Sequence, residues 1–188
     1  MPQRVGVFCG SQAGNNGRYI EIAILAASSI VQRGYGIVYG GGSVGLMGVL
    51  ADTALAAGGE VIGVIPQALS GKEIAHGGLT ELHVVNSMHE RKALMEGLSD
   101  AFIALPGGFG TMDEFCEILT WAQLRIHAKP VGLLNTSGYY DELIALFDKM
   151  VREGFVTPRN RTLVRSAGSI DELLDLMLPT SCACRPRA

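Results

Sequence analysis

Short apolar runs alternate along this chain with longer segments whose apolar residues recur three and four positions apart. The short runs predict strands and the longer segments predict helices, because one face of a helix repeats every 3.6 residues. The predicted strands cover residues 4–11, 35–39, 61–65, 82–85, 101–105 and 131–134. The predicted helices cover residues 18–32, 44–57, 87–98, 111–124, 140–153 and 170–178.

The predicted strands are apolar at consecutive positions rather than at alternate ones. Strands of this kind form a parallel sheet that helices cover on both faces. Alternating strands and helices with short connections predict a doubly wound, Rossmann-like α/β fold with a mostly parallel sheet. Because no repeat or linker divides the 188 residues, we expect one domain over 1–180 and a disordered tail over 181–188.

Composition and charge exclude or disfavour several classes of protein. Hydrophobic residues make up 48% of the chain and charged residues 18%, which excludes an intrinsically disordered protein. The net charge of −3 gives no reason to expect nucleic acid as a partner. No apolar run approaches the ~20 residues of a membrane span, and the N-terminal MPQRVGVFCG lacks a signal-peptide stretch. We therefore expect a cytoplasmic protein that does not bind membranes.

The four cysteines lie at positions 9, 116, 182 and 184, without the spacing of a zinc site or of a disulfide framework. We expect reduced thiols, which agrees with the cytoplasm, and no bound metal.

Glycine is over-represented, with 25 glycines in 188 residues against a usual share of about 7%. Glycine-rich loops follow three of the predicted strands: Gly10-Ser11 the first, residues 40–45 the second and residues 106–110 the fifth. In parallel α/β sheets, ligands bind at this carboxyl edge. Two of the loops lead directly into helices, whose free N–H groups and partial positive charge suit a phosphate group. We therefore expect the three loops to face one phosphate-binding cleft.

The stretch GGGSVG at residues 40–45 fits the G-x-G-x-x-G pattern of dinucleotide-binding folds. Those folds also place an acidic residue at the end of the next strand, where it holds a ribose. Here the next strand ends in Pro66, and Glu60 precedes it at the opposite edge of the sheet. We therefore expect no nicotinamide cofactor. Gly42 and Ser43 are candidate ligand contacts, although the glycines could instead serve only to let the helix pack closely on the sheet.

The stretch PGGFGTMDE at residues 106–114 is more specific. Its glycines allow the backbone to approach an anion, and Thr111 adds a hydroxyl group at the expected helix start. An alanine at Gly110 is expected to obstruct the phosphate or to strain a turn with positive φ. Thr111 and Glu114 also have the spacing of a capping box, which is the structural interpretation of both residues.

Three carboxylates lie beside this expected phosphate site, those of Asp113, Glu114 and Glu117. They would repel a phosphate unless one of them has a separate role. Glu114 and Glu117 are three positions apart and therefore share a helix face.

Two cations, Arg91 and Lys92, occupy the first turns of the helix predicted over 87–98, within the stretch MHERK. The helix macrodipole disfavours cations near a helix start. Either the two side chains form a solvated surface face, or an anionic ligand or a carboxylate partner explains their placement. Ser87 and Glu90 have the spacing of a capping box at this start.

PGGFGTMDE resembles the PGGxGTxxE motif of the Lonely Guy family, the cytokinin riboside 5′-monophosphate phosphoribohydrolases. The stretches GGGSVGLMG, MHERK, SDAFIALPGG and LTWAQLRIHAKPVGLLN are also similar to family motifs, and the resemblance extends from about Val5 to Leu178. Met112-Asp113 stand where plant members commonly have Leu-Glu, a conservative difference. Members were often labelled lysine decarboxylases, but no lysine here lies in a recognisable pyridoxal-binding context.

The resemblance implies that Arg91 and Glu114 form a catalytic pair. It also implies substrate contacts in the glycine-rich loop and in the segments around it. These are Gly107, Gly108, Phe109, Gly110, Thr111, Met112 and Asp113, together with Glu73, Met88, Lys92 and Thr120. With Gly10, Ser11, Gly42 and Ser43 of the other loops, they make up the expected site. The family further implies a homodimer and no metal or organic cofactor.

The reaction implied is hydrolysis of the N-glycosidic bond of N6-modified adenosine 5′-monophosphates, and of AMP, to the free base and ribose 5-phosphate. Cleavage builds positive charge on the ribose, and a carboxylate can stabilise that charge and activate water. Glu114 suits this role because it lies one helical turn beyond the phosphate loop. Arg91 has too high a pKa for a general acid, so we expect it to position Glu114 or the substrate.

Two alternatives stay open. One is a nucleotide-binding carrier or regulatory module on the same scaffold, which would need the glycines but not the acid at Glu114. The other is an enzyme that acts mainly on AMP.

Overall fold

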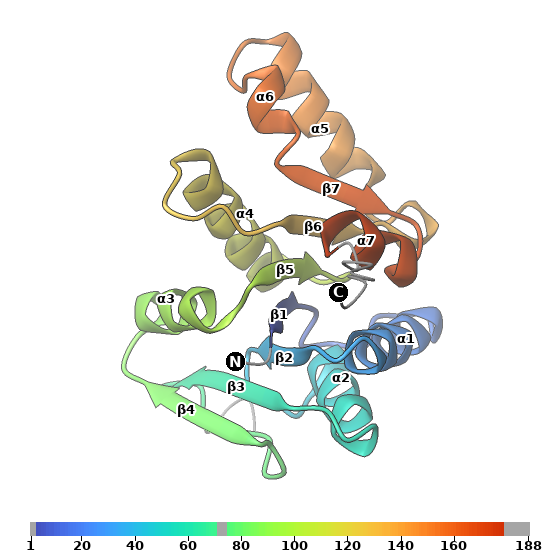
Figure 1. Cartoon of the computed structure of the whole chain (residues 1–188), viewed down its shortest axis with the longest axis vertical. Helices are drawn as coiled ribbons and strands as arrows, with labels where there is room; N and C mark the ends of the chain where they lie inside the picture. The colour runs from blue at the N-terminus through green and yellow to red at the C-terminus, as the bar shows by residue number, and fades with distance from the viewer. Residues whose placement is uncertain (1–2, 71–74, 179–188) are drawn as a thin grey trace, which may run out of the picture.

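The structure is a computed structural model that describes residues 3–70 and 75–178. Seven strands, all paired in parallel, form one sheet in the order β4-β3-β2-β1-β5-β6-β7, with helices on both faces (Figure 1). The predicted doubly wound α/β fold is therefore confirmed. The tail over 181–188 lies outside the described residues, so the expected domain boundary stays a prediction.

The strands are β1 (Arg4–Phe8), β2 (Gly36–Tyr39), β3 (Val61–Pro66), β4 (Glu81–Val85), β5 (Ala101–Ala104), β6 (Val131–Leu134) and β7 (Val164–Ala167). The α-helices are α1 (Arg18–Gln32), α2 (Gly45–Ala56), α3 (Met88–Leu98), α4 (Phe109–Gln123), α5 (Asp141–Arg152), α6 (Pro158–Arg161) and α7 (Ile170–Met177). A 3₁₀ turn, η1, covers Thr136–Gly138.

The strand order reverses between β1 and β5. From β1 the chain builds outward through β2, β3 and β4, and it then returns to the other side of β1 with β5, β6 and β7. β1 and β5 run side by side, with Phe8 opposite Ala104 at their carboxyl ends. The loops that follow these two strands lead into α1 and α4, so a crevice opens between them, and ligands of doubly wound folds bind in such a crevice.

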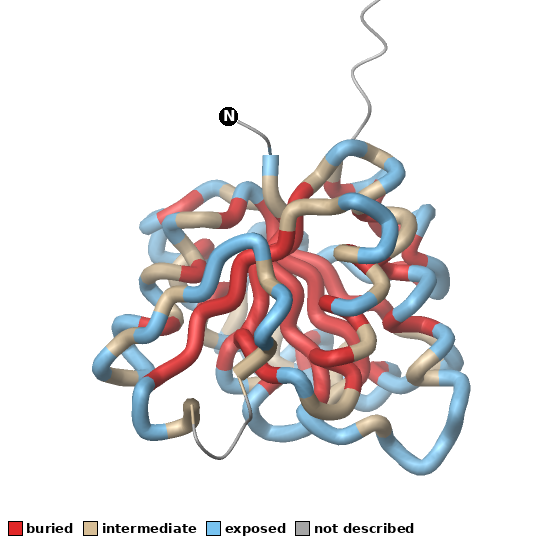
Figure 2. The backbone as a smooth tube through the Cα atoms, turned by 90° about the horizontal axis from the view of Figure 1, so that it is seen from below, coloured by how far each residue is buried: buried red, intermediate tan, exposed pale blue. Residues whose placement is uncertain are grey.

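Each face of the sheet has its own apolar core, and Figure 2 shows the strands as the buried centre of the molecule. On one face, α1, α2 and α7 pack against Val5 and Val7 of β1. On the other face, α3, α4 and α5 pack against Phe8 and Phe102, whose rings stack with centroids 5.8 Å apart. The five central strands are apolar on both sides for this reason.

The edges of the sheet depart from the prediction. β7 was not predicted, because only Val164 and Ala167 are buried while the two residues between them are exposed. The single turn of α6 was also missed. β4, at the other edge, is a predicted strand, but Val84 is exposed. Burial on both faces therefore holds for the centre of the sheet and not for its edges.

Serine side chains cap two helices, and the cap at Ser87 is expected from the spacing. The hydroxyl of Ser87 accepts a hydrogen bond from the backbone N–H of Glu90 at the start of α3. The Glu90 carboxylate does not complete a capping box, since it accepts from the N–H of Asn86 instead. Ser169 caps α7 in the same way, through the N–H of Glu172.

Glu60 lies at the amino edge of the sheet, as the sequence indicates, where Arg4 Nε is 2.7 Å from Glu60 Oε2. The hydrogen bond from Arg4 lowers the pKa of the Glu60 carboxyl group below its usual value. In the part of the chain that the structure describes, no helix combines the length and the apolar character that crossing a membrane requires.

Candidate active site

The three glycine-rich loops meet at the carboxyl edge of the sheet. The N–H of Gly10 donates to the carbonyl of Pro106 (3.2 Å), and the N–H of Leu46 donates to the carbonyl of Gly10 (3.0 Å). A cavity of about 140 Å³ opens where the loops meet. It is lined by Cys9, Gly10, Ser11, Met47, Arg91, Gly108, Phe109, Gly110, Thr111 and Glu114. Two of the three expected loops therefore line one cavity, whereas residues 40–45 do not, and the predicted catalytic pair lies in the cavity wall.

α4 starts at this cavity, two residues earlier than predicted. Gly108 is its N-cap, with an extended backbone, and Phe109 is its first residue. Thr111 consequently lies inside the first turn, and no side chain caps the helix. The capping-box interpretation of Thr111 and Glu114 is therefore wrong. The first backbone N–H groups of a helix have no partner within it, so they are available here to a ligand in the cavity.

Gly107 and Gly110 of this loop differ in whether a side chain would fit at their positions. A Cβ at Gly107 would clash with the Thr111 hydroxyl, so this position requires glycine. A Cβ at Gly110 would meet nothing within 4 Å, and the φ of Gly110 is not positive. The expected strain at Gly110 is therefore wrong, and only obstruction of a ligand remains as the effect of an alanine there.

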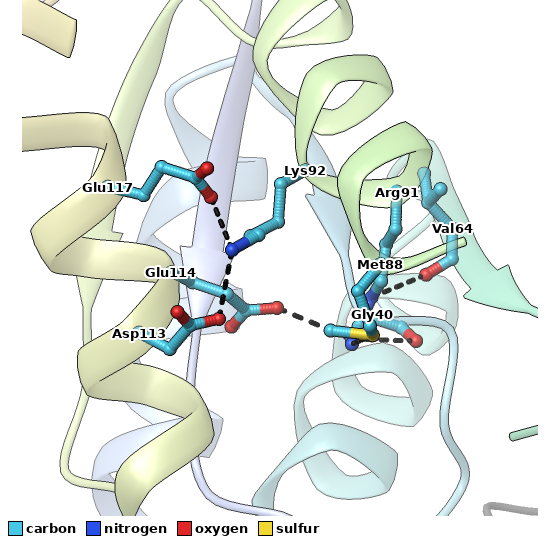
Figure 3. A network of polar contacts seen from close by, with 8 residues as sticks. All are labelled: Gly40, Val64, Met88, Arg91, Lys92, Asp113, Glu114 and Glu117. Carbon is cyan, nitrogen blue, oxygen red and sulfur yellow. Dashed lines mark hydrogen bonds and ion pairs between the residues drawn. The ribbon is translucent and has the colours of Figure 1, made fainter.

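Arg91 and Glu114 form an ion pair across the cavity wall (Figure 3). Arg91 Nη2 is 3.4 Å from Glu114 Oε1, and Arg91 is only 7% exposed. The guanidinium also donates to the carbonyls of Val64 (3.1 Å) and Gly40 (3.3 Å). The ends of β2 and β3 thus fix Arg91 in place. A Cβ at Gly40 would clash with Arg91 Nη2, so this glycine makes room for the guanidinium.

Lys92 connects α3 to α4. Lys92 Nζ is 2.5 Å from Glu117 Oε2 and 3.1 Å from Asp113 Oδ2 (Figure 3). Burial alone would lower the pKa of Lys92, but hydrogen bonds and charges of Glu117 and Asp113 together outweigh it and raise the pKa. The ammonium therefore stays protonated. Arg91 and Lys92 both have carboxylate partners, so their interpretation as a solvated surface face is wrong.

Cys9 and Met88 flank the ion pair. Burial, together with the charge of Glu114, raises the pKa of the Cys9 thiol, so the thiol stays protonated at neutral pH. Met88 Sδ lies 3.8 Å from Arg91 Nη1, so this predicted contact lies beside the Arg91–Glu114 ion pair (Figure 3). Cys9 and Met47 were missed as site residues, since an apolar residue directly after a strand or within a buried helix carries no spacing signal.

Some predicted contacts lie elsewhere. Thr120 donates a hydrogen bond to the Cys116 carbonyl (2.7 Å) and lines a separate groove between α4, α5 and α6. Gly42 accepts a hydrogen bond from the Tyr39 hydroxyl (3.1 Å), and neither it nor Ser43 lines the cavity.

The remaining predicted contacts differ in how far they reach the cavity. Phe109 is 96% exposed at the rim, and Met112 is half-buried against the core. Glu73 lies outside the described residues.

A second cavity, of about 260 Å³, shares the loop walls of the first. Its lining includes Gly10, Gly107, Tyr19 and Tyr139, and the Tyr139 hydroxyl donates to the Gly107 carbonyl (2.7 Å). Sequence reasoning did not find this cavity, because neither tyrosine belongs to a motif.

No group of three or more histidine, cysteine, aspartate or glutamate side chains is arranged to hold a metal ion among residues 3–70 and 75–178. The cavity itself presents a buried carboxylate and a buried guanidinium next to the uncapped start of α4.

Comparison with known proteins gives the same family as the sequence motifs. A family model described as "Possible lysine decarboxylase" matches residues 47–177. A protein of Oryza sativa subsp. japonica named as a probable cytokinin riboside 5′-monophosphate phosphoribohydrolase is 54% identical over 93% of this chain and 78% of its own length. The chain belongs to the Lonely Guy family. A cytokinin riboside 5′-monophosphate phosphoribohydrolase of Arabidopsis thaliana is 51% identical over 92% of this chain and 81% of its own length.

Solved structures share the Lonely Guy fold at lower identity. The molybdenum cofactor binding protein of Rippkaea orientalis matches 94% of this chain and 96% of its own, with a TM-score of 0.69 and 22% identity. The molybdenum cofactor carrier protein of Chlamydomonas reinhardtii matches 91% of this chain and 92% of its own, with a TM-score of 0.68 and 24% identity. At this identity the likeness concerns the fold alone.

Proposed function

We propose that this protein hydrolyses the N-glycosidic bond of cytokinin riboside 5′-monophosphates and releases the free base and ribose 5-phosphate. The observation that carries the proposal is the Arg91–Glu114 ion pair in the same cavity as the uncapped start of α4. The names of relatives that are 54% and 51% identical support the substrate class.

Phosphate binding would place the substrate. The open N–H groups at the start of α4 and its partial positive charge favour a phosphate against residues 108–111. Glu114 lies one helical turn further along α4 and points toward Arg91 across the same cavity (Figure 3). A 5′-phosphate on the loop would therefore bring C1′ of the ribose toward the Glu114 carboxylate.

The Glu114 carboxylate would serve two steps of the reaction. As the bond from C1′ to the base breaks, the base takes the electron pair and the ribose becomes cationic, which the carboxylate stabilises. Water then adds through its oxygen to C1′ and gives a proton to Glu114. Glu114 releases this proton to solvent and the departing base anion takes one up, so the neutral base and ribose 5-phosphate result and the carboxylate is restored. Arg91, fixed by the carbonyls of Gly40 and Val64, would hold the carboxylate toward the ribose.

The proposal includes AMP as a second substrate, because the phosphate and ribose contacts would be the same. It also includes the cytoplasm as the location, which the free thiols of Cys9 and Cys116 support.

We propose in addition that the protein is a homodimer. Thr120, a substrate contact by family resemblance, lies in a groove with Leu119 and Phe147, outside the cavity of its own chain. A second copy that presented this groove to the cavity would bring Thr120 to the substrate.

Incubation with AMP and with isopentenyladenosine 5′-monophosphate tests the proposed hydrolysis. Chromatography should show free base from both nucleotides and none with the Glu114→Gln variant. Tight binding of both nucleotides without release of base would contradict the proposal and would identify a carrier or regulatory module instead.

A further inference from the structure

Five charged side chains lie between α3 and α4, and they form two separate groups. Arg91 pairs with Glu114, while Lys92 pairs with Asp113 and Glu117. Two cations thus face three carboxylates. Only the first group touches the cavity, since Lys92 and Glu117 are absent from its lining.

Two carboxylates that flank Glu114 along α4 contact the Lys92 ammonium. Asp113 directly precedes Glu114 on α4, and Glu117 follows it one turn later on the same helix face. Lys92 Nζ contacts both and therefore lies alongside the Glu114 side chain (Figure 3). The Lys92 side chain is only 10% exposed, so solvent does not compete freely for the ammonium.

Glu117 is the closer and the less exposed of the two carboxylates that face Lys92. Its Oε2 is 2.5 Å from Lys92 Nζ, against 3.1 Å for Asp113 Oδ2, and its side chain is 23% exposed against 57%. Lys92 donates its hydrogen bond to Asp113, but water screens its charge attraction to the closer and less exposed Glu117 less.

We propose that Glu117 is a positioning residue of the catalytic centre, which keeps the Lys92 ammonium away from Glu114 so that Arg91 is the cation that holds the catalytic carboxylate. This inference rests on the proposed function for its effect on the rate. Nothing in the sequence motifs assigns a role to Glu117.

The proposal follows from what a second cation would do to Glu114. The Lys92 side chain has a flexible four-carbon stem, and without Glu117 its ammonium could turn to the neighbouring Glu114 carboxylate. A carboxylate between two cations is a weaker base and stabilises a cationic ribose less. An additional opposite charge within hydrogen-bond distance also lowers the pKa of a carboxyl group by about 1–3 units.

The first experiment compares Glu117→Gln with wild type, with Glu21→Gln on the exposed side of α1 as a control for the lost charge. Glu117→Gln should lower kcat about ten- to hundredfold, leave KM nearly unchanged and move the acidic limb of the kcat–pH profile to lower pH. The limb moves down because Glu114 must be ionised and its pKa would fall. An unchanged kcat and an unchanged acidic limb would overturn the proposal, whatever happens to the melting temperature.

A double-mutant cycle separates positioning from packing. The Lys92→Met variant has no ammonium that could turn to Glu114. Adding Glu117→Gln to it should therefore lower kcat by no more than about twofold. An equal loss in both backgrounds would show that Glu117 acts without Lys92 and would overturn the proposal. If the single variant does not fold, the comparison of Lys92→Met with Lys92→Met/Glu117→Gln, which both lack the Lys92 ammonium, decides the question.

A crystal structure of Glu117→Gln gives a readout that does not depend on activity. Lys92 Nζ should lie within hydrogen-bond distance of a Glu114 oxygen, whereas an ammonium that remains on Asp113 or turns to solvent would overturn the proposal. If wild type released no base, the proposed function would fail, and the position of Lys92 would still test the inference.

Discussion

The role of Glu114 can be tested by removing its charge and keeping its shape. Glu114→Gln retains an oxygen that accepts from Arg91, and Glu114 has no capping role to lose. We expect the free energy of unfolding to fall by no more than about 2 kcal/mol and kcat to fall at least about a hundredfold. Melting curves, AMP affinity and base release measure the three effects.

A Glu114→Gln variant that kept most of its turnover would contradict the catalytic assignment. Asp113 and Glu117, the other carboxylates of this part of α4, would then be the residues to replace.

Gly107 and Gly110 provide a matched pair of substitutions in one loop. Gly107→Ala should destabilise the protein by about 1–3 kcal/mol, because the new methyl group clashes with the Thr111 hydroxyl. Gly110→Ala meets open space within α4, so its stability should be unchanged or up to about 1 kcal/mol higher, while KM rises. Urea unfolding and steady-state kinetics on both variants separate the two effects. A normal KM for Gly110→Ala would show that no ligand approaches this position.

At the scale of elements, the start of α4 predicts that the 5′-phosphate is required. Its open N–H groups would each donate to a phosphate oxygen, and hydrogen bonds to charged groups contribute about 1.5–3 kcal/mol each. That binding energy is used to position the ribose. The kcat/KM for the monophosphate should exceed that for the riboside at least about a hundredfold. Equal values would show that the phosphate does not bind at this helix.

The sequence predicted the central elements well, because their burial on both faces leaves continuous apolar runs. β7 and α6 were missed, since Arg165 and Ser166 face outward and the PRNR turn is too short for a period. The predicted start of α4 is two residues late, because the helix has Gly108 and not a polar side chain at its N-cap, and glycine in a loop does not mark a helix start in the sequence.

The sequence motifs identified most of the residues that line the cavity, including Arg91 and Glu114. The partners of Lys92 were not predicted, because α3 and α4 are separated by β5 in the sequence and spacing along one helix does not describe contacts between two. Thr120 could not be placed either, since its family motif does not say which cavity it faces.

At the scale of the whole molecule, the Arg4–Glu60 pair predicts a pH dependence of stability. Arg4 lowers the pKa of Glu60 in the folded state. The stabilisation is therefore complete above the unfolded pKa of about 4.3 and is lost as the pH falls through the lower folded value.

Glu60→Gln should cost about 0.5–1 kcal/mol at pH 7, and its difference from wild type should shrink below about pH 4. Urea unfolding across this range measures it, with Glu21→Gln as the control. A constant difference would mean that the charge of Glu60 contributes nothing.

The central position of β1 has a consequence for how the chain folds. Val5 pairs with Ile37 on one side and with Ala101 on the other, so the sheet closes around β1 only when distant parts of the sequence have met. Parallel pairings over long sequence separations form slowly, typically in milliseconds to seconds for such topologies. Until β5 docks, one edge of β1 stays open to pairing with other chains. Arg91 and Glu114 lie on either side of β5 in the sequence, so we expect their ion pair to form together with the docking of β5.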